Sequence, residues 1–214
     1  GCSIDSIFPL QFNENIIRLC LFLMVIMQGT TDQQYDGVIK NCRKIFENKT
    51  KDYGTSWRVY RTISIADQIY IKAKRIRNIQ EKGVQKIEDD IRDEFRGMLN
   101  YAIIGLIQLD IDDDEIEDLP VAEAMERYEA KTSIAKKLMQ DKNHDYGEAW
   151  RDMSQDSFVD LILAKVLRIR QMVQNNGLTV ASEGIDSNFY DIINYSVFAL
   201  ILANEPPTFN QHAL

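Results

Sequence analysis

Proline and glycine are scarce in this chain of 214 residues, which contains 4 prolines and 10 glycines. They lie between segments in which apolar residues recur at three- and four-residue steps, a distribution that favours helices over many short strands. Cysteine and histidine are scarce too: three cysteines without a Cys-x-x-Cys pair and two histidines argue against a zinc site of the Cys/His type. An odd set of unpatterned cysteines is typical of reduced thiols, so we expect a cytoplasmic protein.

Positive charge is not in excess, because the formal net charge is −8. A protein that grips the phosphate backbone of a nucleic acid usually carries a basic face, so we do not expect a polymeric nucleic acid as partner. A single nucleotide stays a candidate ligand, because one phosphate cluster needs only a few well-placed cations.

Long apolar runs are also lacking. The apolar run at residues 16–27 is interrupted by Arg18 and is shorter than the roughly 20 residues that a membrane-spanning helix needs. The residues before it contain no Lys or Arg, unlike a secretory signal, so we expect no membrane association. Two interpretations of residues 1–26 are open: a helix packed on the body of the protein, or an extension before a natural start at Met27, with Thr31 as helix N-cap.

An internal duplication is the strongest signal that the sequence does contain. Residues 49–58 return 93 positions later at 142–151, and both segments read Lys-x-x-Asp-Tyr-Gly with a Trp three residues after the Gly. A Lys-x-x-Arg-Ile-Arg motif at 72–77 returns at 165–170 with the same offset. Further matched pairs are Ser64 with Ser157, Asp67 with Asp160 and, after one inserted residue, Phe95 with Phe189 and Asn100 with Asn194. Such a register predicts two tandem copies of one unit.

Helical periodicity predicts three helices in each copy. The third helix is apolar nearly all round and is expected at the buried centre. We therefore expect an all-α fold, a helical bundle of two degenerate repeats of about three helices each, related by a pseudo-twofold axis. The helices are expected at 31–48, 64–81 and 87–109 in copy one, and at 120–141, 157–175 and 185–203 in copy two. The expected boundaries are an extension at 1–30 without a functional role, copy one at 31–109, an acidic linker at 110–119, copy two at 120–204 and a tail at 205–214.

The repeated aspartates of the second helix have two interpretations. Asp67 and Asp160 lie three residues after Ser64 and Ser157, and Ser-x-x-Asp resembles a capping box at a helix start. The alternative is that the carboxylates bind a metal or act as a base.

The repeated cations of the same helix are equally open. Lys72 and Arg75, and likewise Lys165 and Arg168, lie one helical turn apart on one face. A Lys/Arg pair suits phosphate oxygens, with Lys as a point charge and Arg as a fork. The alternative is a solvated face, or pairing with acids of a neighbouring helix.

The Lys-x-x-Asp-Tyr-Gly segment is expected to be a loop whose glycines, Gly54 and Gly147, adopt a positive φ or allow a close backbone approach. In the functional interpretation its tyrosines wall a pocket for a planar base, and its aspartates bind a cation or a base edge. In the alternative these residues build the turn, and the tryptophans fill the core behind it. The residues are Asp52, Tyr53 and Trp57 in copy one and Asp145, Tyr146 and Trp150 in copy two.

The third helix contributes polar residues as well. Asn100 and Asn194 lie inside apolar sequence, so their amides must find partners on a neighbouring helix or a ligand. The acids at its start have diverged between the copies, and carboxylates at three- and four-residue spacing can bind Mg²⁺ or simply favour a helix N-terminus.

With these motifs the chain resembles the nucleotide modification associated domain 1 family, once catalogued as a domain of unknown function in bacteria and phages. The resemblance covers nearly all of 31–203 and implies phage-type nucleotide chemistry. More distantly, the helix order resembles the all-α nucleoside triphosphate pyrophosphohydrolases of the MazG type, which use Glu-x-x-Glu and Glu-x-x-Asp to bind Mg²⁺. The sequence departs from that pattern, because its second helices carry Lys-x-x-Arg. The Glu-x-x-Asp position reads Glu94-x-x-Gly97 in copy one and Asn188-x-x-Asp191 in copy two.

Three hypotheses follow. The first is an enzyme similar to a nucleoside triphosphate pyrophosphohydrolase, with Mg²⁺-dependent hydrolysis or transfer at nucleotide phosphates. The second is a module that binds a nucleotide or another phosphorylated small molecule without chemistry. The third is a helical interaction module, and a homo-oligomer is compatible with all three.

The candidate site residues are drawn from both copies. The candidate catalytic residues are Asp145, Asp160, Glu183 and Asp191. The candidate metal ligands are Asp52, Asp67, Glu94 and Asp186. The candidate substrate-binding residues are Tyr53, Tyr146, Lys72, Arg75, Lys165, Arg168, Asn100 and Asn194.

Overall fold

The computed structural model describes residues 14–83, 90–111, 118–175 and 184–204, with side chains from residue 30 onward. These residues form six α-helices and two short 3-10 helices, and they contain no strand. The elements are α1 (Glu14–Tyr53), η1 (Ser56–Val59), α2 (Thr62–Lys82), α3 (Ile91–Asp110), α4 (Val121–Tyr146), η2 (Ala149–Asp152), α5 (Gln155–Gln174) and α6 (Ile185–Asn204). The predicted all-α fold is confirmed, and the second and third helices of each copy lie within a few residues of their expected bounds.

The chain divides into two compact units, residues 1–34 and 35–214. Helix α1 runs through the boundary, so the described part of the first unit is helix from residue 14 onward. The prediction that a helix begins at Thr31 is therefore wrong: Thr31 is an interior residue of α1. No proline interrupts residues 14–53, and an isolated glycine inside a helix costs only about 1 kcal/mol, so the helix continues. None of the helices in the described ranges is both long and apolar enough to cross a membrane.

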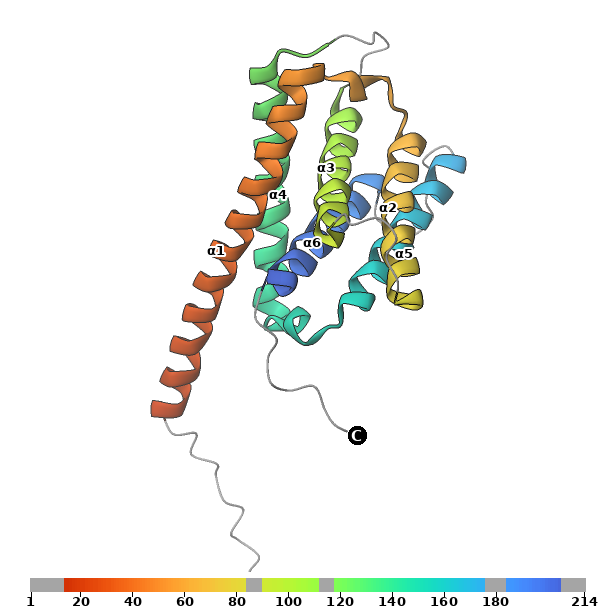
Figure 1. Cartoon of the computed structure of the whole chain (residues 1–214). Helices are drawn as coiled ribbons and strands as arrows, with labels where there is room; N and C mark the ends of the chain where they lie inside the picture. The colour runs from red at the N-terminus through yellow and green to blue at the C-terminus, as the bar shows by residue number, and fades with distance from the viewer. Residues whose placement is uncertain (1–13, 84–89, 112–117, 176–183, 205–214) are drawn as a thin grey trace, which may run out of the picture. The chain divides into compact units, whose positions relative to one another are not determined.

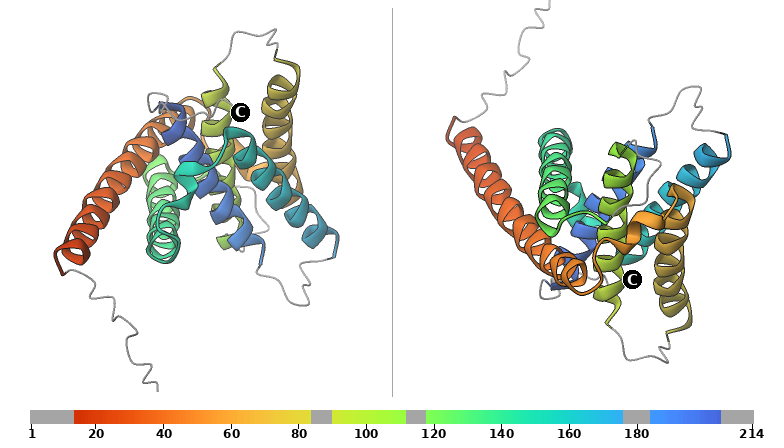
Figure 2. Two further views of the ribbon diagram at one scale, coloured as in Figure 1. Left: turned by 90° about the horizontal axis from the view of Figure 1, so that it is seen from below. Right: turned by 90° about the horizontal axis from the view of Figure 1, so that it is seen from above.

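Helices α3 and α6 form the centre of the second unit, as expected for the third helix of each copy. They pack against each other, α2 and α5 pack on them from one side, and α4 lies along the other (Figures 1 and 2). The crossing is close because Gly105 has no side chain: a Cβ at this position would lie 2.6 Å from the Phe189 ring. The core is thus built around the α3–α6 pair.

A buried asparagine on α6 joins that helix to both first helices. The Asn194 side chain accepts a hydrogen bond from the Tyr35 hydroxyl of α1 at 2.8 Å and donates one to the Ala135 carbonyl of α4 at 3.1 Å. Burial raises the pKa of the Tyr35 hydroxyl, which therefore stays a proton donor. The Asn194 amide is satisfied without any ligand.

The other copy repeats this arrangement with the helices exchanged. On α3, Asn100 accepts a hydrogen bond from the Tyr128 hydroxyl of α4 at 2.9 Å and donates to the Cys42 carbonyl of α1 at 3.1 Å. Tyr128 lies 93 residues after Tyr35, so the two tyrosines are repeat equivalents. Each third helix therefore bonds the first helices of both copies, and the pseudo-twofold relation extends to individual hydrogen bonds.

Helices α2 and α5 are joined by a second reciprocal pair. Arg170 donates to Asp67 at 2.6 Å, and Arg77 lies 3.4 Å from Asp160. The Arg170 guanidinium also lies over the Tyr70 ring, 4.0 Å from its centroid. The repeated aspartates therefore pair with the repeated arginines of the other copy.

These contacts correct the capping-box interpretation of the second helices. Helix α2 begins at Thr62, so Ser64 is already inside it. The N-cap of α5 is Ser154, whose hydroxyl accepts from the Ser157 backbone N–H. Ser157 is thus a donor in the first turn, and the aspartate three residues later is too far into the helix to cap it.

Candidate functional site

The Lys-x-x-Asp-Tyr-Gly segment is a helix end rather than a free loop. Helices α1 and α4 continue through Tyr53 and Tyr146, and the next residue, Gly54 or Gly147, ends each helix with φ of 64° or 62°. Glycine adopts this left-handed conformation without the strain that a Cβ brings. The predicted positive φ is confirmed at both positions.

A cavity of about 440 Å³ opens beside this helix end in copy one. Its walls come from the last turns of α1, from η1 and from α2 and α3. The residues that line it are Ile45, Phe46, Lys49, Thr50, Tyr53, Gly54, Ser56, Trp57, Tyr60, Gln68, Lys72, Asp93, Glu94, Arg96, Gly97, Asn100, Tyr101 and Ile104. The Asp-Tyr-Gly helix end and the second-helix lysine of copy one thus face the same space.

One wall of the cavity is charged. Lys72 donates to Glu94 at 3.0 Å, and Arg75 donates to the other oxygen of the same carboxylate. Burial alone would raise the pKa of Glu94, but the hydrogen bonds and charges of Lys72 and Arg75 outweigh it and lower that pKa. Glu94 is therefore ionised and bound by both cations, of which Lys72 faces the cavity.

The floor beneath Lys72 lacks a side chain. A Cβ at Gly97 would lie 2.8 Å from Cε and 3.2 Å from Nζ of Lys72, so the lysine side chain lies directly against the glycine. Lys49, in the last turns of α1, is exposed and lines the same cavity. Two lysines thus line the cavity, and one of them, Lys72, lies against a position without a side chain.

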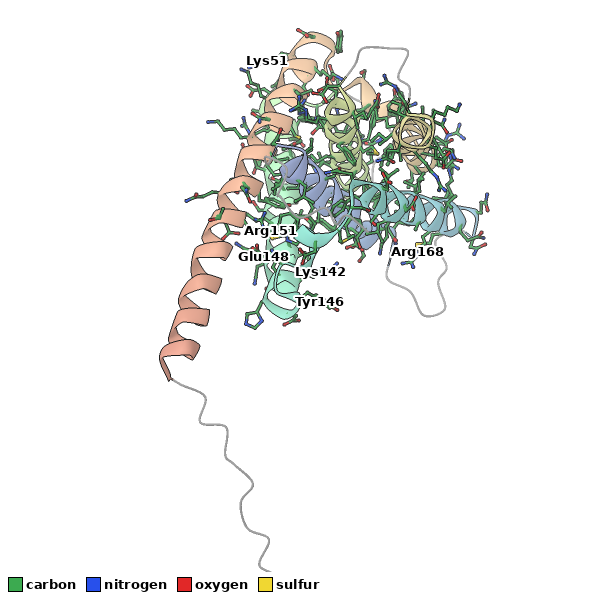
Figure 3. The ribbon with its side chains drawn as sticks, turned by 60° about the horizontal axis from the view of Figure 1, so that its bottom comes forward. Lys51, Lys142, Tyr146, Glu148, Arg151 and Arg168 are labelled. Atoms are coloured by element: carbon green, nitrogen blue, oxygen red, sulfur yellow. The ribbon has the colours of Figure 1, made fainter. Side chains whose placement is uncertain are left out.

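The equivalent position in copy two carries an acid. Asp191, the counterpart of Gly97, accepts from Lys142 at 2.6 Å and lies 2.5 Å from the Lys165 ammonium. The side chains of Asp191 and Lys165 are only 10% and 15% exposed, whereas that of Lys142 is 57% exposed. Arg168 is exposed, and in Figure 3 it lies along α5, away from Lys142 and Tyr146 at the end of α4. Lys165 and Asp191 thus meet in one cluster with Lys142.

The aromatic residues of the Asp-Tyr-Gly segment divide into two kinds. Tyr53 and Tyr146 are 69% and 75% exposed, whereas Trp57 and Trp150 are 8% and 6% exposed. Trp150 stacks on Phe198 with ring centroids 4.3 Å apart. The tryptophans fill the core behind the helix end, and the tyrosines are available at the surface.

The residues that follow the helix end of copy one are bonded to Asp118, near the end of the predicted linker. Asp118 accepts hydrogen bonds from the backbone N–H and the hydroxyl of Thr55, the latter at 2.6 Å. A Cβ on Gly54 would collide with the Asp118 carboxylate. In copy two the position of Thr55 is taken by the buried Glu148, which accepts a hydrogen bond from Arg151 at 2.7 Å. Most of the predicted linker, residues 112–117, lies outside the described residues.

The remaining candidate carboxylates are dispersed. Asp52, Asp145 and Asp186 are exposed, and Asp145 lies 3.2 Å from the ring of His144. Glu183 lies outside the described residues. Within those residues no three His, Cys, Asp or Glu side chains gather into a group that could bind a metal ion.

Sequence reasoning missed part of the cavity wall. Lys49 and Tyr101 line the cavity and recur as Lys142 and Tyr195, so the repeat itself carried a signal for them. Arg96 also lines the cavity, but nothing in the repeat distinguishes it from a surface arginine.

The comparisons with known proteins identify the repeated segments. The model of the nucleotide modification associated domain 1 family matches residues 49–109 and 142–202, which together make up more than half of the chain. No curated protein and no solved structure matches the chain. Both matched segments begin at the first lysine of the Asp-Tyr-Gly segment and run to within two residues of the end of the third helix, and the first contains every residue of the cavity wall except Ile45 and Phe46. The chain therefore belongs to the nucleotide modification associated domain 1 family, whose domain it carries in two tandem copies.

Proposed function

We propose that this protein binds a nucleotide or a closely related phosphorylated small molecule in the copy-one cavity. The observation that supports this most is that two lysines, Lys49 and Lys72, line one recess together with three tyrosines. Membership of a family associated with nucleotide modification makes a nucleotide the first ligand to test.

The size and the lining of the cavity suit such a ligand. A volume of about 440 Å³ lies in the range of small-molecule sites, which run from about 300 to 1,000 Å³. Tyr53, Tyr60 and Tyr101 offer faces on which a planar base stacks, and the lysines offer charge for a phosphate. Gln68 adds an amide that can donate to or accept from a base edge.

Binding without a metal is the simplest form of this proposal. Glu94 is the most enclosed carboxylate of the cavity, and Lys72 and Arg75 already bind both of its oxygens. A Mg²⁺ ion at Glu94 would have to displace these cations. Mg²⁺-dependent hydrolysis or transfer at the phosphates is the second candidate, and it is favoured by one observation: Asp93 lines the cavity together with Glu94.

Thermal unfolding with a panel of nucleoside mono-, di- and triphosphates tests the proposal. A ligand at 100 times its Kd raises the free energy of unfolding by about 2.7 kcal/mol, so at least one nucleotide should clearly raise Tm, in EDTA as well as in Mg²⁺. A shift seen only with Mg²⁺, together with release of phosphate or pyrophosphate, would favour the second candidate. No shift with any nucleotide under either condition would overturn both.

The two exposed tyrosines supply a matched pair of variants. Tyr53→Ala should weaken binding about 3- to 10-fold, because it removes one stacking face of the cavity. Tyr146→Ala, at the repeat-equivalent position, should leave the Kd unchanged. Neither change should lower the free energy of unfolding by more than about 0.5 kcal/mol, because both side chains are exposed. Equal Kd values for the two variants would place the ligand elsewhere.

A further inference from the structure

The two copies place different groups beside equivalent lysines. In copy two, Asp191 is held between Lys142 and Lys165, at 2.6 and 2.5 Å. In copy one, the counterparts of these lysines are Lys49 and Lys72, and the counterpart of Asp191 is Gly97. Copy one thus has both cations but not the carboxylate that lies between them in copy two.

In copy one both lysines line a space that a ligand can enter. Lys49, Lys72 and Gly97 all line the 440 Å³ cavity. Glu94 binds Lys72 from one helical turn earlier on α3, but it is also held by Arg75, so it does not replace a carboxylate between the two lysines. Copy two has the opposite arrangement: the counterpart of Glu94 is the neutral Asn188, and the acid stands at Asp191 instead.

We infer that copy one holds a phosphate subsite next to Gly97, between Lys49 and Lys72, and that the Asp191 carboxylate is its built-in stand-in in copy two. The inference rests on the proposed function in that the phosphate belongs to the ligand of the copy-one cavity. It adds where that phosphate binds, and it makes copy one the only copy with this subsite open. Two ammonium groups that hold one carboxylate in copy two can hold a phosphate monoester through the same charge-assisted hydrogen bonds.

Exchanging the residues between the copies tests the inference. Gly97→Asp supplies copy one with its own carboxylate and should weaken the binding of a nucleoside monophosphate at least tenfold. Gly97→Asn, of the same size but uncharged, should weaken it far less. The atoms nearest to an added Cβ belong to the flexible end of the Lys72 side chain, which can move, so both variants are expected to fold. Equal losses in the two variants would mean that space, not charge, is responsible, and would overturn the subsite.

The reverse exchange should open the second site. Asp191→Gly removes the carboxylate that Lys142 and Lys165 share, so the monophosphate should bind at two sites per chain instead of one in calorimetry. Inorganic phosphate should also raise the Tm of Asp191→Gly more than that of the wild type, compared with chloride at equal ionic strength. Unchanged stoichiometry together with no extra effect of phosphate would contradict the stand-in role.

A third variant does not depend on a change in the core. Lys49 is exposed, so Lys49→Gln should fold normally and weaken monophosphate binding about fivefold or more. Lys51→Gln is the matched control, because Lys51 lies on the same helix end but pairs with Glu47 at 2.6 Å and does not line the cavity. An effect as large at Lys51 as at Lys49 would indicate general charge attraction and overturn the subsite.

The outcomes separate this inference from the proposed function. If nucleotides bind and Tyr53→Ala weakens them while Lys49→Gln and Gly97→Asp do not, the subsite falls and the proposed function stands. If no nucleotide binds the wild type, the proposed function falls, and the phosphate response of Asp191→Gly still decides whether Asp191 fills an anion site.

Discussion

The two copies are nearly identical in their contacts at the centre of the molecule, but they differ around the cavity. At the centre, the Tyr–Asn hydrogen bond from α1 to α6 and its counterpart from α4 to α3 agree in length to within 0.1 Å. At the cavity, copy one places Glu94 and Gly97 beside Lys72, whereas copy two places Asn188 and Asp191 beside Lys165. The central polar residues that are the same in both copies therefore bond the two halves to each other. The positions around the second-helix lysine, in contrast, carry different residues in the two copies.

This difference shows why repetition of a polar residue is a weak guide to function by itself. Asp67, Asp160, Arg77 and Arg170 recur because each half of the molecule supplies one member of each cross-copy pair. The charges that differ between the copies are a better guide to function. A change in the acids beside a lysine that both copies have changes what that lysine can bind.

The buried asparagines give the largest expected effect. Asn194→Ala leaves the buried Tyr35 hydroxyl without its acceptor and removes the second hydrogen bond of the Ala135 carbonyl, which keeps its bond within α4. At about 1–3 kcal/mol for the unpaired hydroxyl and about 1 kcal/mol for the lost hydrogen bond, the free energy of unfolding should fall by about 2–4 kcal/mol. Urea unfolding monitored by circular dichroism measures it.

Asn100→Ala is the matched variant in the other half, and it should cost about the same, because its two hydrogen bonds are repeat-equivalent. A difference above about 1 kcal/mol between the two variants would break the equivalence of the two halves at the centre.

Glu94 gives a smaller effect that depends on pH. Glu94→Gln gives copy one the neutral amide that copy two has at Asn188, and it should lower the free energy of unfolding by about 1–2 kcal/mol at pH 7. Because Lys72 and Arg75 lower the pKa of Glu94 in the folded state, this stabilisation is present above the pKa of the unfolded chain. It disappears as the pH falls through the lowered folded-state pKa, where wild-type Glu94 becomes neutral.

Urea midpoints of the wild type and of Glu94→Gln between pH 7 and about pH 3 measure this effect. The two curves should converge at the acid end. A difference that stays constant over the whole range would show that the carboxylate charge is not what stabilises α3 against α2.

The sequence predicted most of the fold, because the repeat and the apolar periodicity act locally. Helix α1 was the exception: Thr31 resembles an N-cap, but no residue in front of it stops the helix. Contacts between copies could not be predicted from the sequence, because the pairing of Asp67 with Arg170 depends on how α2 and α5 pack. The Asn–Tyr bonds were hidden for another reason, because Tyr35 and Tyr128 recur at the right offset but lie outside the motif segments.

The candidate site was predicted only in part. The sequence suggested Tyr53, Lys72, Glu94 and Asn100, and all four line the cavity. The divergence of Gly97 and Asp191 was visible as a change of charge, but its meaning depends on two lysines from different helices meeting over that position. Such a meeting is a property of the packed bundle and leaves no local pattern in the chain.

The cross-copy ion pairs give the smallest effect, and they sharpen the comparison because they are repeat equivalents of unequal quality. Arg170 bonds Asp67 at 2.6 Å, stacks on Tyr70 and has a side chain that is 25% exposed. Arg77 lies 3.4 Å from Asp160, has a side chain that is 44% exposed and also binds Glu81. Exposed ion pairs contribute about 0–1 kcal/mol, and stacking over an aromatic ring adds about 0.5–1 kcal/mol.

Arg170→Ala should therefore lower the free energy of unfolding by about 1–2 kcal/mol and Arg77→Ala by no more than about 0.5 kcal/mol. Double-mutant cycles with Asp67→Ala and Asp160→Ala isolate the two couplings, and the Arg170–Asp67 coupling should be the larger and should weaken with added salt. Helices α2 and α5 also carry Lys72 and Lys165. Equal coupling energies would mean that the two ion pairs fix α2 and α5 equally strongly. The difference between the two lysine environments would then rest on the third helices alone.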